Sequence, residues 1–328
     1  MLLERLVDSG RVPAPVLRAG IRAVCALRLH QEARADRRAF IDGLRAAPIA
    51  IATDAANAQH YEVPARFFEL VLGPHLKYSS AYYPAGVRAL GDAEAAMLEL
   101  TAARAGLADG QRILDLGCGW GSLSLWAAAR YPRARITAVS HSHGQRAFIE
   151  RAAAARGLGN VRVVTGDVRT LTLDGAFDRV VSIEMFEHMR NYRTLLARIA
   201  GWLAPGGALF VHVFAHRRHA YPFEDAGASD WMAREFFTGG LMPSVDLLRR
   251  FQDDLRVTHE WQLDGGHYAR TALAWHDNLM RHRAEVEVVL GDRRRLHRWR
   301  VFFLACAEMF GFRGGREWLV AHYRFAAP

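Results

Sequence analysis

Three ionisable side chains stand close together at the end of one apolar run of the sequence. The run DRVVSIEMF covers 178–186, and Glu184, Glu187 and His188 lie within it or just beyond it. A carboxylate or an imidazole at such a place can hold an amine and accept its proton. The alternative is a helix N-terminal cap with a satisfied histidine. We expect Glu187 to orient or deprotonate a substrate, with assistance from His188.

A second motif has the spacing D-x-G-x-G-x-G and contains Asp115, Gly117, Gly119 and Gly121. It follows a predicted strand and precedes a predicted helix, where glycines let the backbone approach a ligand closely. Dinucleotide-binding proteins carry G-x-G-x-x-G instead, and Trp120 occupies a position where a pyrophosphate site requires a small residue. The motif therefore favours S-adenosylmethionine over a nicotinamide cofactor, and a methyltransferase over a dehydrogenase.

The second predicted strand lacks the acidic residue that usually binds ribose hydroxyls in such folds. Its end reads Ser-His-Ser-His-Gly-Gln, from Ser140 through Ser142 to Gln145. We expect Gln145 to hydrogen-bond the ribose through its amide. Asp167, after the third strand, is expected to bind the adenine amino group, with helix capping as the alternative. Ser140, Ser142, Val168 and Glu184 belong to the same predicted cofactor site.

The elements that must position these residues begin at about residue 110. From there, short runs rich in Val, Ile and Leu alternate with helical segments, which is typical of a parallel sheet covered on both faces. We therefore predict an α/β fold with a doubly wound, mostly parallel sheet of seven strands. The expected strands cover 112–117, 135–140, 161–166, 178–186, 208–214, 256–263 and 317–326.

The chain is predicted to have two parts. Residues 1–58 form an N-terminal helical extension, and residues 59–328 form the methyltransferase domain, with a substrate lid at about 215–255 and 269–312. We interpret the extension as a helical cap on the core. The alternative is an amphipathic segment at a membrane surface, because Arg18, Arg22, Arg28 and Arg34 would share its polar face.

Composition sets limits on partners and location. The 328 residues carry a formal charge of +9, and all basic residues except Lys77 are arginine. A codon bias toward arginine explains this excess; attraction to an anionic phospholipid surface is the alternative. The arginines are scattered, which argues against nucleic acid. Three distant cysteines and the absence of an export signal or of a membrane-spanning apolar run predict a cytoplasmic protein without disulfides. The sequence leaves open whether the chain forms a homodimer.

Several separate motifs occur in an order that resembles the superfamily of cyclopropane-fatty-acid synthases and plant coclaurine N-methyltransferases. They are LDLGCGWGSL, VSHSHGQ, SIEMFEHMRNY and HYARTALAW, and the resemblance runs from about His60 to the C-terminus. HAYPFE, FQDD and the ending EW are closer to the N-methyltransferase branch. The resemblance implies a Rossmann-like class I methyltransferase fold, S-adenosylmethionine as donor, S-adenosylhomocysteine as product and a small hydrophobic amine as acceptor.

The resemblance also implies roles for single residues. Tyr78 and Ser79 match positions that close over the methionine part of the cofactor. Gly117, Gly119 and Gln145 match the cofactor loop and the ribose contact. The pair Glu187 and His188 matches the catalytic pair of the N-methyltransferases, with Glu184 nearby.

The lipid branch of the resemblance offers an alternative function, methylene or methyl transfer to an unsaturated acyl chain of a phospholipid. That branch implies bicarbonate as the base, held by Glu187, His212, Tyr268 and a cysteine, whose position is Ser80 in this sequence. Taken alone, His212 in its apolar strand and Tyr268 at a helix start are equally well core residues. No metal is predicted, because the histidines at 216–219 lack carboxylate or cysteine ligands at useful spacing.

Overall fold

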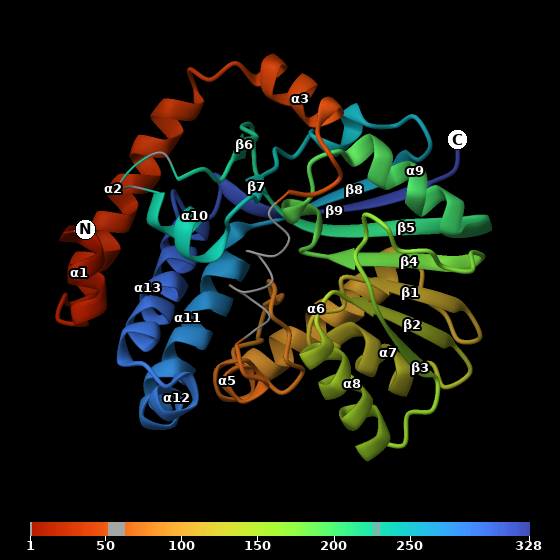
Figure 1. Cartoon of the computed structure of the whole chain (residues 1–328), viewed down its shortest axis with the longest axis horizontal. Helices are drawn as coiled ribbons and strands as arrows, with labels where there is room; N and C mark the ends of the chain where they lie inside the picture. The colour runs from red at the N-terminus through yellow and green to blue at the C-terminus, as the bar shows by residue number, and fades with distance from the viewer. Residues whose placement is uncertain (1, 52–62, 226, 228–229) are drawn as a thin grey trace.

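A seven-stranded sheet forms the centre of the computed structural model, which describes residues 2–51, 63–225, 227 and 230–328 (Figure 1). The strand order is β3-β2-β1-β4-β5-β9-β8. The strands from β3 to β5 are parallel, and β9 runs antiparallel to both β5 and β8. The bounds are β1 Arg112–Leu116, β2 Arg135–Ser140, β3 Val161–Thr165, β4 Phe177–Ile183, β5 Leu203–His216, β8 Arg256–Leu263 and β9 Trp318–Ala326. The doubly wound, mostly parallel sheet is thus confirmed.

Helices cover both faces of this sheet, as the apolar strands require. Ile113 packs with α6 (Leu90–Ala105) and α7 (Ser122–Arg130). The next residue, Leu114, packs on the opposite face with α9 (Tyr192–Trp202) and α3 (Arg37–Ala46). This alternation is that of a strand buried on both sides. The edge strand β3 and its neighbour β2 are covered by α8 (His143–Ala155).

All seven predicted strands form, and the largest differences from the expected bounds are at the start of β5 and at the end of β4. β5 begins at Leu203, because the turn of residues 204–207 continues the strand through a register shift against Phe177. β4 ends at Ile183, before the charged cluster, since Glu184 has a positive φ of 48° that no strand residue adopts. The backbone then enters a 3-10 turn, Phe186–His188.

A layer of helices lies beside the carboxyl ends of the parallel strands, in the left half of Figure 1. It is built from α1 Leu2–Ser9, α2 Ala14–Glu32, α5 Ala65–Val71, α10 Trp231–Phe236, α11 Gly265–Arg281, α12 Arg283–Leu290 and α13 Arg293–Phe310. Two short strands, β6 Tyr221–Pro222 and β7 Leu241–Met242, and a 3-10 turn, Leu248–Arg250, complete the segment between β5 and β8. Both predicted lid segments therefore contribute to this layer, and their movement stays a prediction.

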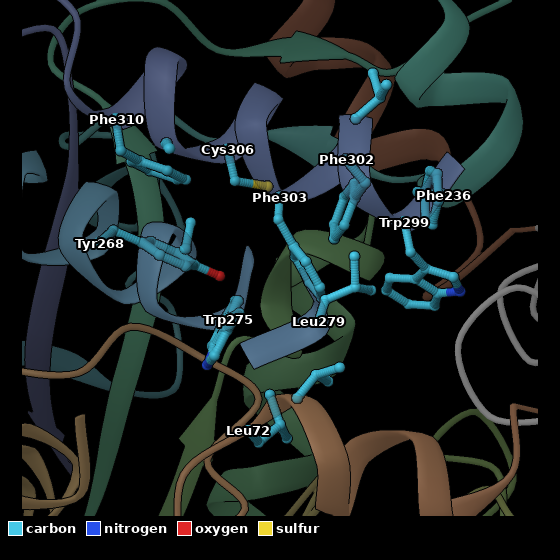
Figure 2. Packing of buried hydrophobic residues seen from close by; sticks show 14 of the residues in the cluster. Leu72, Phe236, Tyr268, Trp275, Leu279, Trp299, Phe302, Phe303, Cys306 and Phe310 are labelled. Carbon is cyan, nitrogen blue, oxygen red and sulfur yellow. The ribbon is translucent and has the colours of Figure 1, made fainter. Parts of the chain in front are cut away.

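Aromatic side chains hold α11 and α13 together (Figure 2). Tyr268 and Phe310 stack with ring centroids 4.2 Å apart. Phe303, which is fully buried, contacts both Trp275 and Trp299. Such ring pairs add to the stabilisation from the apolar area that they bury, so this cluster gives the layer a rigid interior.

The N-terminal helices are fastened to the helical layer by ion pairs. Pro13 is the N-cap residue of α2, and Arg18 and Arg22 both pair with the buried carboxylate of Glu308 on α13. Arg28 pairs with Asp230, whereas Arg34 is exposed. The side chains of Arg18 and Arg22 are still 41% and 61% exposed, so contact of this face with a membrane surface stays a prediction. Among the described helices, none combines the length and the hydropathy of a membrane span.

Truncation of Phe303 tests the importance of the aromatic cluster. Phe303→Ala is expected to lower the free energy of unfolding by about 3–5 kcal/mol, because it leaves a cavity among well-packed rings. Urea denaturation followed by circular dichroism measures this change. The control Val288→Ala, at a side chain that is 80% exposed, should change stability by less than about 0.5 kcal/mol. Equal effects of the two substitutions on the free energy of unfolding would contradict the stabilising role of the aromatic cluster.

Candidate functional site

A cavity of about 480 Å³ lies between the carboxyl ends of the strands and the helical layer. Residues that follow β1, β2 and β4 line one side, and aromatic residues of the helical layer line the other. This position, outside the strand ends where the strand order reverses between β1 and β4, is where doubly wound folds bind ligands. Seven of the predicted cofactor residues line it: Tyr78, Ser79, Asp115, Gly117, Gly119, Gln145 and Glu184.

The glycine loop forms the floor of this cavity. Gly117 has a φ of 85°, and a Cβ atom there would lie 2.8 Å from the Met185 side chain. Gly119 also has a positive φ, and a Cβ atom there would meet open space. The first position thus requires glycine for space, and both require it for backbone conformation. The loop leaves room for a ligand against bare backbone.

Asp115 stands under the loop at the end of β1. Its carboxylate accepts a hydrogen bond of 2.6 Å from the Ser124 hydroxyl of α7. Burial raises the pKa of Asp115 to about 6. The side chain thus joins the strand end to the helix that follows the loop.

Gln145 is held so that its amide NH₂ group remains available as a donor. The Ser140 hydroxyl donates to Gln145 Oε1 over 2.7 Å, and the Ser142 backbone N–H donates to the Ser140 hydroxyl oxygen. With the carbonyl side thus occupied, the amide nitrogen can bond a ligand hydroxyl. Ser140 and Ser142 do not themselves line the cavity; they position Gln145.

The predicted adenine contacts lie outside the cavity lining. Asp167 accepts a hydrogen bond from the backbone N–H of Arg169 and pairs with the guanidinium of the same residue. Val168 also does not line the cavity. The Asp167 carboxylate thus acts locally in this structure, and an adenine contact stays a prediction.

The segment before α6 brings three side chains to the cavity wall. The buried carboxylate of Glu94 accepts backbone N–H bonds from Gly73 and His75, which fixes the course of this segment. Lys77, Tyr78 and Ser79 then face the cavity, and the Lys77 ammonium donates to the Ser79 hydroxyl. Burial lowers the pKa of Lys77 to about 8.

The carboxylate of Glu184 is the polar centre of the cavity. Glu184 Oε1 accepts hydrogen bonds from the Ser80 backbone N–H at 3.0 Å and from His212 Nε2 at 3.1 Å. Glu184 Oε2 accepts a bond of 2.6 Å from the Tyr268 hydroxyl. Burial raises the pKa of the Glu184 carboxyl, whereas the Lys77 charge and these donors oppose the rise. Three donors on one buried carboxylate favour its ionised form.

Glu187 lies behind this centre and does not line the cavity. Its side chain is fully buried, Oε1 accepts the Phe214 backbone N–H at 2.8 Å, and Oε2 has no hydrogen-bond partner. Burial, together with the charge of Glu184, raises the pKa of Glu187 well above its usual range. The lipid-branch resemblance places Ser80, His212 and Tyr268 together with Glu187 around a bicarbonate ion. In this structure the three groups bond Glu184 instead, because the turn after β4 directs that carboxylate toward them.

His188 lines the cavity and stacks on Phe237, with ring centroids 5.8 Å apart. Burial lowers the pKa of His188 to about 4, so the ring is neutral near pH 7. A neutral imidazole can contact a ligand through hydrogen bonds without adding charge. Glu184 and His188 thus face the cavity together, four positions apart along the turn.

Several residues that line the cavity were not predicted from the sequence. The N-terminal helices contribute part of the apolar wall through Val16, Ile21 and Val24, which the sequence showed only as a helical face. Lys77, the single lysine of the chain, was not predicted as a site residue, although it directly precedes the predicted cofactor residues Tyr78 and Ser79. Among the described residues, no group of three or more His, Cys, Asp or Glu side chains could hold a metal ion.

Comparisons with known proteins show the family of the chain. The family model described as mycolic acid cyclopropane synthetase matches residues 51–316. An (S)-coclaurine N-methyltransferase of Thalictrum flavum subsp. glaucum is 37% identical over 345 residues, which cover 99% of this chain and 94% of the relative. The cyclopropane-fatty-acyl-phospholipid synthase of Escherichia coli strain K12 is 29% identical over 269 residues, covering 81% of this chain and 67% of the relative.

A solved structure matches the whole architecture. The crystal structure of a coclaurine N-methyltransferase bound to N-methylheliamine and S-adenosylhomocysteine superimposes with a TM-score of 0.94 and 34% sequence identity. The match covers 98% of each chain. The N-terminal helices and the helical layer thus belong to the shared architecture.

Replacement of Gln145 tests the predicted ribose contact. Gln145→Ala is expected to weaken S-adenosylhomocysteine binding about 3- to 10-fold, because one or two hydrogen bonds are lost. Isothermal titration calorimetry measures the affinity. The control Gln31→Ala removes an exposed amide on α2 and should leave the affinity unchanged. An unchanged affinity of the Gln145 variant would remove this residue from the cofactor site.

Proposed function

Because the chain belongs to the mycolic acid cyclopropane synthetase family, and is thus an S-adenosylmethionine-dependent methyltransferase, we propose that it methylates the nitrogen of a small hydrophobic amine. The relatives that support this acceptor are named coclaurine N-methyltransferases and align with nearly the whole chain. The described residues suit the donor, since bare backbone at Gly117 and the free amide of Gln145 meet at the cavity.

One observation carries the choice of acceptor. In the lipid branch, the resemblance implies that a bicarbonate ion is the base. Here the Ser80 backbone N–H, the His212 ring Nε2–H and the Tyr268 hydroxyl all donate to the carboxylate of Glu184. The protein's own carboxylate therefore takes these donors, and a second anion beside it would meet like-charge repulsion in a buried place. A built-in base suits an acceptor that carries a removable proton, such as an amine.

The chemistry of the residues follows from this arrangement. When bound, S-adenosylmethionine supplies a methyl group on a sulfonium, which needs alignment rather than activation. Glu184 accepts a proton from the ammonium form of the amine at one carboxylate oxygen, which exposes the nitrogen lone pair for the methyl group. Glu187, whose pKa is raised most, stays neutral and leaves the shared negative charge on Glu184.

The aromatic side of the cavity supports the amine as well. Phe223, Phe237 and Phe302 line the wall opposite the strand ends, and His188 stacks on Phe237. Flat rings pack against an apolar amine, and their faces attract the ammonium of a methylated product. Because these residues come from 215–255 and 269–312, we include in the proposal that both segments close over the acceptor.

A panel of acceptors tests the proposed substrate class. Incubation with methyl-labelled S-adenosylmethionine, a set of aromatic amines and vesicles of unsaturated phospholipid should place label in an amine, with no requirement for bicarbonate. Mass spectrometry of the separated amine and lipid fractions reads the result. Label in the acyl chains alone would overturn the amine proposal in favour of the lipid alternative.

Two matched substitutions identify the base. Glu184→Gln is expected to lower kcat about 10²- to 10⁴-fold, the usual contribution of a general base, while S-adenosylhomocysteine affinity is kept. Glu187→Gln should have a much smaller effect, because Glu187 is buried away from the cavity and held neutral. Steady-state kinetics with the best amine measures both variants. The opposite order would return the role of base to Glu187.

Chemical rescue provides a control for the Glu184 result. Glu184→Ala leaves the Ser80, His212 and Tyr268 donors in place but without their acceptor. Added bicarbonate or formate should restore part of the lost rate to this variant and none to Glu184→Gln, whose amide still fills the space. If neither anion changes the rate of Glu184→Ala, the proposal that Ser80, His212 and Tyr268 together hold an anionic base is contradicted.

A further inference from the structure

The base of the proposed reaction lies at one end of a row of hydrogen-bonded side chains that runs across the neighbouring strands β9 and β5. Arg104 Nη1 lies 2.8 Å from His322 Nδ1, and His322 Nε2 lies 3.0 Å from His212 Nδ1. His212 Nε2 then reaches Glu184 Oε1 over 3.1 Å. These residues come from α6, β9, β5 and the turn after β4, and His212 and His322 are direct cross-strand partners.

The direction of each bond in this row follows from the chemistry of its first member. A guanidinium only donates hydrogen bonds, so His322 Nδ1 must be the acceptor and His322 Nε2 must carry the proton. His322 Nε2–H then donates to His212 Nδ1, which leaves the proton of His212 on Nε2. This N–H donates to the carboxylate. Every donor in the row therefore points from Arg104 toward Glu184.

Both rings are uncharged in this row. Burial lowers the pKa of His212 well below its usual range, and burial has the same effect on His322, to which His212 and Arg104 add. The positive charge of the row thus resides on Arg104. That side chain is half-buried and its guanidinium lies over the Trp261 ring at 4.9 Å, which fixes its position.

We propose that Arg104 and His322 are positioning residues, which lock the tautomer of His212 and thereby hold Glu184 as an ionised, correctly oriented base. A chain of polarised hydrogen bonds strengthens each of its members in a buried environment. Without the guanidinium, both imidazoles lose the constraint on their tautomers, and His212 can present a lone pair to the carboxylate instead of a proton. This inference rests on the proposed role of Glu184.

Other charged or titratable groups also face Glu184. Lys77 precedes α6, His188 and Glu187 belong to the turn after β4, Tyr268 comes from α11 and Cys306 from α13. None of these groups belongs to the row. Substitution of Arg104 or His322 therefore leaves all of them in the protein, as the same background for wild type and variants. The row adds a direct hydrogen bond to Glu184 Oε1, whereas Lys77 acts on Glu184 through its charge.

The pH dependence of kcat/KM tests this role. Removal of a donor that favours the charged carboxylate raises the pKa of Glu184, so the acidic limb of the profile must move to higher pH. Arg104→Met is expected to move it upward by roughly 0.5–1 pH unit, the equivalent of one hydrogen bond. The control Arg324→Met removes a positive charge from the same strand as His322, outside the row, and should leave the limb in place.

Two substitutions at His322 separate positioning from mere packing. His322→Gln keeps one acceptor and one donor in the side chain and should retain much of the wild-type profile, whereas His322→Phe should shift the limb as Arg104→Met does. If the Arg104→Met and Arg324→Met profiles coincide, or if His322→Gln and His322→Phe behave alike, the positioning role is overturned.

A measurement that does not use activity separates this inference from the proposed reaction. In protein labelled with ¹⁵N-histidine, the ring nitrogens of His212 and His322 should both show an unprotonated Nδ1 and a protonated Nε2, with assignments from the two His322 variants. In Arg104→Met, at least one ring should lose this single pattern. Wild-type spectra with a proton on either Nδ1 would overturn the inference, even if Glu184 proved to be the base.

Discussion

A single buried carboxylate organises the site, and its burial is the constraint that the surrounding structure satisfies. An ionised group without water is costly unless several donors surround it, and Glu184 receives donors from three different parts of the fold. The segment before α6 supplies a backbone N–H, β5 supplies an imidazole and α11 supplies a phenol. The core sheet, the helical layer and the segment between them thus meet at one side chain.

The need of a buried carboxylate for hydrogen-bond donors also accounts for the bonds of Glu94 and for the backbone conformation of Glu184. Glu94 is also a buried carboxylate. It accepts hydrogen bonds from the backbone N–H groups of Gly73 and His75, in the segment that leads to Ser80. The positive φ of Glu184 turns its side chain out of the β4 register and toward the cavity. A non-glycine residue in that conformation costs free energy and persists where its surroundings over-determine it. Strain and burial are here concentrated at one functional position.

The helical layer makes the other half of the site, by packing rather than by charge. In the aromatic cluster of α11 and α13, Tyr268 packs against Phe310 (Figure 2). From this position its hydroxyl donates a hydrogen bond to Glu184. The N-terminal helices are fastened to this layer through Glu308, and they close the apolar wall. The cavity thus lies between the strand ends of the sheet and an apolar wall assembled from both ends of the chain.

The amino-acid sequence by itself determined the seven strands, the doubly wound sheet and the glycine loop, because each depends on local periodicity or on neighbouring residues. It also placed the charged cluster at the end of β4. Only the tertiary structure decided between Glu184 and Glu187, since a three-residue turn with one positive φ sets which carboxylate faces the cavity. Only strand register brought His322 beside His212, and only packing turned Arg18 and Arg22 toward Glu308. Contacts between distant segments depend on geometry that no local pattern records.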